Sequence, residues 1–177
     1  QRGNRPAWNS RAWKSSQVTV EGPARIDLGG GWSDTPPFCL DWGGTVLNVA
    51  VLLNGAHPIQ TTIRRLSEPV VRCISDEGST SEEAGLVAEY RTSEELLHPP
   101  GPGDPFAIPR AALGMTGLFR REDALRQVLE RLGGGIEIRT AVALPMGSGL
   151  GTSSILAATI LRGIAEMLGA DLSGQRL

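Results

Sequence analysis

The order of the predicted elements indicates that this 177-residue chain is an α+β protein. Predicted strands fill the first half of the chain, and the second half holds helices with one further strand between them. The length suits one domain or slightly more. Hydrophobic residues make up 40% of the chain, which is enough for a substantial core, and the sequence contains no internal repeats.

Four strands are predicted in the first half. The first alternates apolar and polar side chains up to a glycine cluster, and the others are short runs rich in β-branched residues. Asn54-Gly55 separates the second strand from the third and is a strong turn signal. The acidic segment 76–84 follows the fourth strand and predicts a loop. The four strands are expected within residues 17–30, 45–53, 57–64 and 69–75.

Helices dominate the prediction for the second half. One helix is expected after Asp104-Pro105, a pair suited to the N-cap and the first helical position. Residues 122–132 place apolar side chains at i, i+3, i+4 and i+7, which is one face of a helix that Gly133 ends. A strand is predicted over 135–145. The last helix, 153–168, is apolar nearly all round, which predicts deep burial.

Composition and charge narrow the partners that this chain is expected to have. A net charge of −2 gives little electrostatic support for binding a nucleic acid. No apolar run is long enough to cross a membrane, and the N-terminal segment lacks the apolar core of a secretory signal. Cys39 and Cys73 have no His or Cys neighbour, which favours two reduced thiols over a disulfide. We therefore expect a cytoplasmic protein with no nucleic-acid or membrane partner.

The glycine-rich segment 145–154, PMGSGLGTSS, leads directly into the last predicted helix. The first N–H groups of a helix have no partner within the helix, and together with the helix dipole they form an anion site. Glycines at the alternate positions 147, 149 and 151 allow the backbone to wrap a phosphate, and the hydroxyls that follow can donate to it or bind Mg²⁺. A glycine turn with a Thr or Ser N-cap is the structural alternative.

Two other phosphate-binding loops fit this segment less well. A Walker A loop requires a Lys, and the segment contains none. A Rossmann fingerprint requires Gly or Ala where Thr152 stands, and it requires a strand before the distal acidic residue. Asp171 has the right spacing for that residue, but it follows a predicted helix.

A second glycine cluster lies in residues 23–37, PARIDLGGGWSDTPP. The absence of side chains at 29–31 allows a ligand to approach closely. Asp34 can accept hydrogen bonds from the paired hydroxyls of a sugar, Trp32 can stack on the apolar face of a sugar, and Arg25 can neutralise phosphate charge. A β-turn capped by Asp34, with Arg25 in a surface ion pair, explains this segment equally well.

Together, the two segments resemble motifs of the GHMP small-molecule kinases. GPARIDLGGGWSDTP is similar to the first motif of that superfamily and PMGSGLGTSS to the second, and they occur in the family order. The first motif is most similar to the branch of L-fucose kinases and heptose-phosphate kinases, because galactokinases carry Gly-Glu-His where this chain has Gly30-Gly31-Trp32. The resemblance covers residues 17–177. It implies the α+β fold of a GHMP kinase N-terminal domain, a fold type shared with the second domain of a ribosomal protein, truncated before the C-terminal half.

The resemblance implies a role for each motif residue. Asp34 corresponds to a residue that contacts the sugar, with Trp32 and Gly31 beside it. Arg25 corresponds to a residue that positions the sugar hydroxyl or stabilises charge on the transferred phosphoryl group. The second loop corresponds to the one that wraps the phosphates of ATP, with Ser153 as a Mg²⁺ ligand. The implied nucleotide-binding residues are Pro145, Gly147, Ser148, Gly149, Leu150, Gly151, Thr152 and Ser153.

The resemblance also implies an activity, namely ATP-dependent phosphorylation of a sugar, with L-fucose to L-fucose 1-phosphate as the leading reaction. The alternatives are a heptose-phosphate or other sugar kinase, and a non-catalytic relative that senses sugar or nucleotide. The family's catalytic Asp is expected beyond Leu177. We therefore expect residues 17–177 to be the N-terminal part of a kinase domain in a larger parent with flanking domains. Residues 1–16 are expected to be a linker or mobile arm, and the chain alone is expected to be inactive and poorly folded.

The remaining candidate side chains are assigned no chemistry. His57 and His98 lack the spacing of metal ligands. Trp13 is expected to be a packing or linker residue. Glu94 and Glu95 are expected to be solvated charges on a loop.

Overall fold

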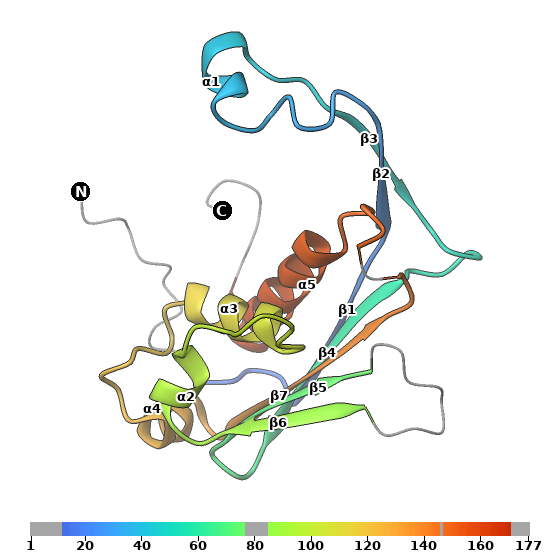
Figure 1. Ribbon diagram of the computed structural model, residues 1–177. Coiled ribbons are helices and arrows are strands. Elements are labelled where there is room, and N and C mark those ends of the chain that lie inside the picture. The colour runs from blue at the N-terminus through green and yellow to red at the C-terminus, as the bar shows by residue number, and fades with distance from the viewer. Residues whose placement is uncertain (1–11, 77–84, 146, 171–177) are drawn as a thin grey trace.

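The computed structural model describes residues 12–76, 85–145 and 147–170. They form a five-stranded sheet with helices packed on it, which we call the body, and a two-stranded sheet with one short helix, residues 24–56, which we call the arm (Figure 1). The body sheet has the strand order β1-β4-β7-β5-β6. The body elements are β1 (Gln17–Gly22), β4 (Ile59–Leu66), β5 (Val71–Ser75), β6 (Leu86–Tyr90), α2 (Ser93–Leu97), α3 (Ala107–Met115), α4 (Leu125–Leu132), β7 (Gly135–Val142) and α5 (Thr152–Met167), and the arm elements are β2 (Ala24–Gly29), α1 (Phe38–Trp42) and β3 (Leu47–Val51).

This architecture confirms the predicted α+β class. In the body sheet, β5 and β7 pair in parallel, whereas the other neighbouring strands are antiparallel. A Rossmann fold is built on a mostly parallel sheet, so this topology excludes the Rossmann alternative for the glycine loop. The distal residue of that alternative, Asp171, lies outside the described residues.

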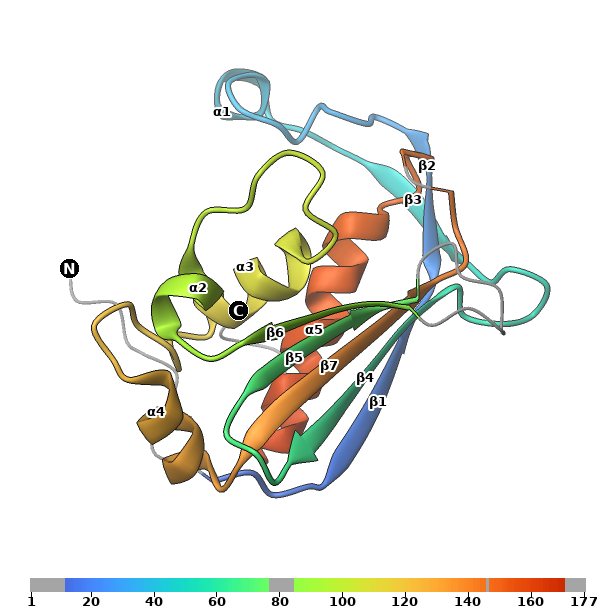
Figure 2. The same ribbon diagram turned by 60° about the horizontal axis from the view of Figure 1, so that its bottom comes forward.

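α5 covers one face of the body sheet, with α3 beside it (Figure 2). The helix begins and ends within one residue of the predicted 153–168. Ile160 and Ile164 are fully buried against the sheet, but Ala158 and Arg162 are exposed. The prediction of burial nearly all round was therefore wrong for the outer face, because alanines and an arginine can lie in solvent at little cost.

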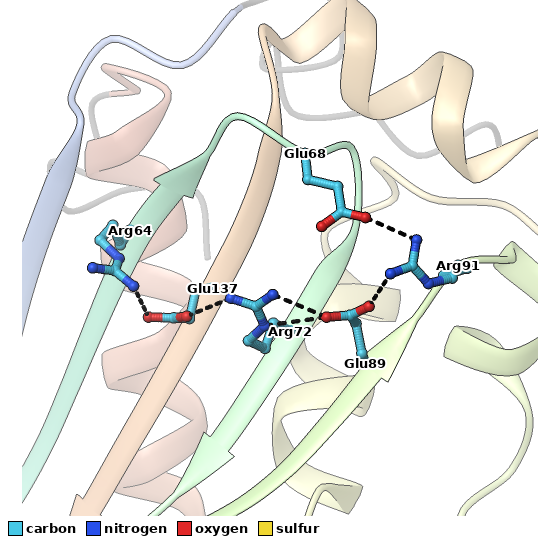
Figure 3. A network of polar contacts seen from close by, with 6 residues as sticks. All are labelled: Arg64, Glu68, Arg72, Glu89, Arg91 and Glu137. Carbon is cyan, nitrogen blue, oxygen red and sulfur yellow. Dashed lines mark hydrogen bonds and ion pairs between the residues drawn. The ribbon is translucent and has the colours of Figure 1, made fainter.

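The other face of the sheet carries a ladder of alternating charges (Figure 3). Glu137 on β7 lies 2.9 Å from Arg64 on β4 and 3.3 Å from Arg72 on β5. Arg72 also donates to Glu89 on β6 and thereby holds the pKa of that carboxyl below its ordinary value. Three arginines alternate with three glutamates, so the ladder makes this face of the sheet polar without giving it a net charge. Its members are Arg64, Glu137, Arg72, Glu89, Arg91 and Glu68.

Pro23 divides the strand that was predicted over residues 17–30. β1 pairs with β4 in the body, and β2 pairs with β3 in the arm. Proline has no N–H group to donate to a strand ladder, and the chain changes sheets at this residue. The predicted single strand was therefore wrong, and the correct description is two strands in two sheets.

The predicted Asn54-Gly55 turn is confirmed. Asn54 and Gly55 have φ angles of 50° and 80°, and Leu53 and Ala56 exchange backbone hydrogen bonds across them. The flanking strands β3 and β4 lie in different sheets. The turn therefore connects the arm to the body instead of closing a long hairpin.

The sequence analysis missed α1, α2 and β6. α2 begins with a capping box, in which Thr92 Oγ1 accepts from the Glu95 N–H and the Glu95 carboxylate accepts from the Thr92 N–H, both at 3.2 Å. The prediction that Glu95 is a plain loop charge was therefore wrong. The T-x-x-E pattern that encodes this cap was available in the sequence.

The helix predicted after Asp104-Pro105 begins later than expected, at Ala107. Asp104 does not cap it, because its Oδ1 accepts instead from the Phe106 N–H at 2.8 Å in the preceding turn. Pro109 lies in the first turn of α3, where a missing N–H costs no helical hydrogen bond. The helix predicted over 122–132 is confirmed as α4 from Leu125 onward, so it begins later than expected, and Gly133 ends it with a φ of 94°.

Trp13 lies in the core, although we expected residues 1–16 to be a linker or mobile arm. Its side chain is only 5% exposed, and its Nε1 donates to the Gly134 carbonyl at 3.0 Å. Residues 1–11 and most of the predicted acidic loop, 77–84, lie outside the described residues. Among the described helices, none combines the length and the apolar character that a membrane crossing requires.

Candidate functional site

The glycine-rich loop lies against the first strand of the arm. The Arg25 N–H on β2 donates to the Leu150 carbonyl at 3.0 Å. A β-carbon added at Gly151 would lie only 3.4 Å from Cβ and Nε of Arg25. Two motifs that are far apart in the sequence therefore meet at the N-terminus of α5 (Figure 1).

The three alternate glycines of the loop share one unusual backbone conformation. Gly147, Gly149 and Gly151 have φ angles of 74°, 73° and 73°, in the left-handed region that glycine tolerates best. The Pro145 carbonyl accepts from the Ser148 N–H at 3.3 Å and closes the first turn of the loop. The backbone from β7 to α5 thus uses the positive φ angles that these glycines allow. Met146 lies outside the described residues.

The N-terminus of α5 carries backbone donors that the described protein atoms leave unpaired. The first helical N–H with an acceptor is that of Ile155, which donates to the Gly151 carbonyl at 3.0 Å. In the described part of the chain, the N–H groups of Thr152, Ser153 and Ser154 have no acceptor, and no side chain caps the helix. Ser154 Oγ instead donates to the Gly151 carbonyl at 2.9 Å. The alternative of a glycine turn with a Thr or Ser N-cap is therefore not what this loop forms.

Arg25 adds a positive charge beside these donors. Its Nε lies 3.2 Å from Asp27 Oδ1, and its Nη2 donates to Asp27 Oδ2 at 3.5 Å. The Nε atom is buried but is not aligned for a hydrogen bond. The ion pair foreseen in the alternative interpretation of this segment thus exists. It does not separate Arg25 from the loop, because the same side chain also lies against Gly151.

The residues predicted to bind a sugar lie in the turn that precedes α1. Trp32 is 83% exposed and has a φ of 71°, and the side chain of Asp34 makes no hydrogen bond or ion pair with any described residue. Ser33 holds this turn instead, since its Oγ donates to the Thr45 carbonyl at 3.0 Å and accepts from the Thr45 N–H at 3.1 Å. The alternative in which Asp34 caps the turn is therefore wrong.

Close backbone contacts fix the shape of this turn. A β-carbon at Gly30 would lie 1.9 Å from the Thr45 carbonyl oxygen, so only glycine fits there. Gly31 is open by comparison, because its nearest neighbour would be Asp27 Oδ2 at 3.9 Å. The structure therefore brings Arg25 to the glycine loop but leaves Asp34 and Trp32 pointing into solvent. No hydrogen bond or ion pair between described residues joins those two side chains to the loop.

Asp27 is the site residue that the sequence analysis did not select. It lies two residues after Arg25 on β2, and the period-two geometry of a strand puts both side chains on one face. That spacing was the available signal.

The described residues contain no cluster of three His, Cys, Asp or Glu side chains that could hold a metal ion. Burial raises the pKa of the Cys73 thiol to about 12, which makes this residue unsuitable as a nucleophile.

Known structures share this fold. A D-glycero-D-manno-heptose 1-phosphate kinase from Bacteroides thetaiotaomicron superposes with a TM-score of 0.56 over 87% of this chain and 43% of that chain, at 21% identity. A Lactococcus lactis galactokinase complexed with galactose superposes with a TM-score of 0.59 over 89% of this chain and 34% of that chain, at 15% identity. Residues 118–177 match the family described as GHMP kinases N terminal domain. The chain has the fold of a GHMP kinase N-terminal domain.

Sequence similarity extends over most of this GHMP kinase fold. The chain is 40% identical over 154 residues to an L-fucokinase/L-fucose-1-P guanylyltransferase of Bacteroides fragilis, which covers 83% of this chain. It is 34% identical over 167 residues to a bifunctional fucokinase/GDP-fucose pyrophosphorylase of Arabidopsis thaliana, which covers 94% of it. The chain spans only 15% and 14% of the lengths of these two relatives. Its sequence thus resembles those of fucokinases, as the first motif indicated.

Proposed function

We propose that this chain is the N-terminal part of a kinase that transfers phosphate from ATP to L-fucose, giving L-fucose 1-phosphate. The observation that carries the proposal is the junction of the two motifs, where Arg25 and the glycine loop meet at the uncapped N-terminus of α5. Similarity to two proteins named as fucokinases supports L-fucose as the acceptor, and the small share of their length that this chain spans supports a parent protein with further domains.

The loop is suited to hold a polyphosphate. The unpaired N–H groups at the start of α5 point along the helix axis, and the helix dipole adds to their attraction for an anion. Arg25 adds a full positive charge on the β2 side. Because phosphoryl transfer depends mainly on positioning and on charge stabilisation, these groups supply what this half of a kinase site requires. Among the described residues, we assign no general base.

Ser153 is the residue that would hold Mg²⁺. Its hydroxyl is exposed in the first turn of α5 and makes no hydrogen bond with the described residues. One hydroxyl cannot form a complete cage, so the fit is to an ion that arrives with ATP and keeps phosphate oxygens and waters as its other ligands. When bound, Mg²⁺ would neutralise charge on the phosphates.

The turn before α1 would bind the sugar. Asp34 has a free carboxylate that can accept from two neighbouring hydroxyls, and the exposed ring of Trp32 can stack on the apolar face of a pyranose. Gly31 leaves room for close approach. The hydrogen bonds between Ser33 and Thr45 fix the backbone of the turn before any sugar binds, which lowers the ordering cost of binding.

A substrate screen of the full-length protein tests the function. ATP consumption would be measured with L-fucose, galactose and heptose phosphates, and L-fucose is expected to give the highest kcat/KM. Turnover of another sugar without turnover of L-fucose would show that the substrate assignment is wrong. Nucleotide or sugar binding without turnover of any sugar would favour the non-catalytic, sensing alternative.

Two substitutions test the division of the site. Asp34→Ala is expected to raise the KM for sugar by about tenfold or more, because it removes a charged hydrogen-bond acceptor. Ser153→Ala is expected to raise the KM for Mg-ATP by a similar factor of about ten, because it removes a metal ligand. Asp41→Ala in the arm and Ser67→Ala in the body are matched controls and should leave both constants unchanged. Unchanged kinetics in both test variants would show that these residues do not form the site.

A further inference from the structure

We propose that Asp27 is a positioning residue that aims the Arg25 guanidinium at an anion bound on the N-terminus of α5. The inference rests on the proposed function in one respect, namely that the anion is the triphosphate of ATP. Asp27 itself would touch neither phosphate nor sugar. It would act through Arg25.

The contact between the two side chains leaves the ligand-binding part of the guanidinium open. Asp27 lies along the Nε and Nη2 edge, where its Oδ1 is 3.2 Å from Nε as an ion pair and its Oδ2 accepts a hydrogen bond from Nη2 at 3.5 Å. No acceptor for Nη1 lies within hydrogen-bonding distance among the described residues. An arginine held along one edge in this way still presents the end of its planar fork, and that end matches two oxygens of a phosphate.

Two close neighbours define the position of Arg25. One is Gly151, where an added β-carbon would come within 3.4 Å of Arg25 Nε. The other is the Asp27 carboxylate, whose Oδ1 lies 3.2 Å from the same Nε. A free arginine side chain has many rotamers, and each must be suppressed before the guanidinium can act on one oxygen. The Asp27 contact reduces that freedom before the ligand arrives.

Folding stability does not account for this ion pair. The side chains of Arg25 and Asp27 are 42% and 33% exposed, and pairs that are this accessible to solvent add little to stability. The pair also lies at the start of the arm, where the Arg25 N–H donates to the Leu150 carbonyl of the glycine loop. An orienting role explains why a carboxylate is placed beside a cation at an anion site, where it would otherwise weaken attraction for phosphate.

The backbone of β2 is irregular directly after Asp27. The register between β2 and β3 shifts after Asp27, which pairs with Asn48, while Gly29 pairs with Leu47. This irregularity increases the local twist of the strand and allows the chain to turn away into the glycine cluster. Asp27 Oδ2 also lies near Gly31, because a β-carbon added there would be 3.9 Å from this oxygen. The carboxylate therefore lies between the phosphate loop and the turn proposed to bind sugar.

A double-mutant cycle in the full-length protein tests the proposal. Asp27→Ala is expected to lower kcat/KM for ATP by about tenfold while the KM for sugar stays within about twofold, since a misplaced cation impairs the phosphate side of the site alone. In an Arg25→Ala background the same substitution should have no further effect, because a residue that acts only through Arg25 is silent without it. Asp27→Asn keeps the shape of the side chain and should resemble Asp27→Ala. The control, Glu166→Ala, breaks the Arg162–Glu166 pair farther along α5 and should leave the kinetics unchanged.

A binding measurement separates this proposal from the proposed function. The affinity of the same variants for inorganic triphosphate, measured by calorimetry, should fall by about tenfold on Asp27→Ala only when Arg25 is present. Equal losses in both backgrounds would overturn the proposal, as would a raised KM for sugar, which would make Asp27 a sugar ligand. A wild-type protein that binds no triphosphate would overturn it as well. A wild-type protein that binds triphosphate but phosphorylates no sugar would overturn the proposed function alone, and the triphosphate cycle would still decide the role of Asp27.

Discussion

The body and the arm treat their apolar side chains in opposite ways. In the body, Ile63 on β4 and Ile138 on β7 have no exposed surface, because α5 covers one face of the sheet. In the arm, by contrast, large apolar side chains lie in solvent on both strands and on α1. Ten of the thirteen exposed large hydrophobic residues of the described chain belong to the arm: Ile26, Leu28, Trp32, Phe38, Leu40, Trp42, Leu47, Val49, Leu52 and Leu53.

This difference separates the two halves of the proposed site. The phosphate-binding loop ends in a helix that is anchored in the body core, so its donors are held by packing that the chain provides itself. The turn with Asp34 lies on a two-stranded sheet, and such a sheet is at best marginally stable on its own. The prediction that the isolated chain folds poorly therefore applies to the arm more than to the body.

The largest expected difference between the two regions is in thiol reactivity. Cys39 on α1 is half-buried in the arm, whereas Cys73 on β5 is fully buried in the body. Burial raises the pKa of the Cys73 thiol from 9.0 to about 12. Near neutral pH, its thiolate is therefore about a thousandfold scarcer than that of a thiol with the ordinary pKa. A disulfide reagent should therefore label Cys39 about a hundredfold or more faster than Cys73 in the native chain, because burial both blocks access to Cys73 and makes its thiolate scarce, and the greater nucleophilicity of that thiolate offsets only part of the difference.

Single-cysteine variants make this measurement clean. Cys39→Ser reports on Cys73, Cys73→Ser reports on Cys39, and both thiols should react at one rate in denaturant. The raised pKa of Cys73 in the folded state also predicts a pH dependence of folding stability. The contribution of this thiol to stability is complete below pH 9.0 and is lost as the pH rises toward about 12. Equal native rates would show that the body opens as readily as the arm.

A pair of truncations gives the next largest contrast. Ile138→Ala removes a fully buried side chain from the central strand and is expected to lower the free energy of unfolding by about 3 kcal/mol. Val49→Ala removes atoms from a side chain that is 40% exposed on β3 and should cost less than about 1 kcal/mol. Denaturant unfolding of the full-length protein, followed by far-ultraviolet circular dichroism, measures both. A comparable loss in the two variants would mean that the arm is as tightly packed as the body.

The sequence predicted the elements that local chemistry determines. The apolar faces of α4 and α5, the Asn54-Gly55 turn and the glycine loop all depend on side chains within a few residues of each other. The association of Arg25 with the loop could be expected only from the resemblance to a family, because it joins β2 to α5 across most of the chain. Even so, the predicted place of the loop, between a strand and the last helix, was correct.

The errors have a shared physical origin in tertiary context. The sequence offers the same alternation on both sides of Pro23, and it is the pairing partners, β4 and β3, that divide it into two sheets. Trp13 was expected to be a packing or linker residue, and its contact near Gly134, which no local pattern reveals, makes it a packing residue. The capping box at Thr92 is different, because its pattern is local and was overlooked.

The smallest expected contrast concerns the two short helices, α2 in the body and α1 in the arm. Thr92→Ala removes the side-chain cap of α2 and is expected to lower the free energy of unfolding by about 1 kcal/mol. Thr35→Ala, just before α1, is the matched control, because no side chain caps α1 and Thr35 accepts from the Cys39 N–H only through its backbone carbonyl. It should change the stability by less than about 0.5 kcal/mol. Glu95→Ala, which removes the other half of the capping box, should cost no more than Thr92→Ala, and the double variant should cost less than the sum because the two hydrogen bonds form one unit. Strictly additive losses from Thr92→Ala and Glu95→Ala would show that the two capping hydrogen bonds do not form one unit. An equal loss from Thr35→Ala would show that the cap of α2 does not distinguish the body from the arm.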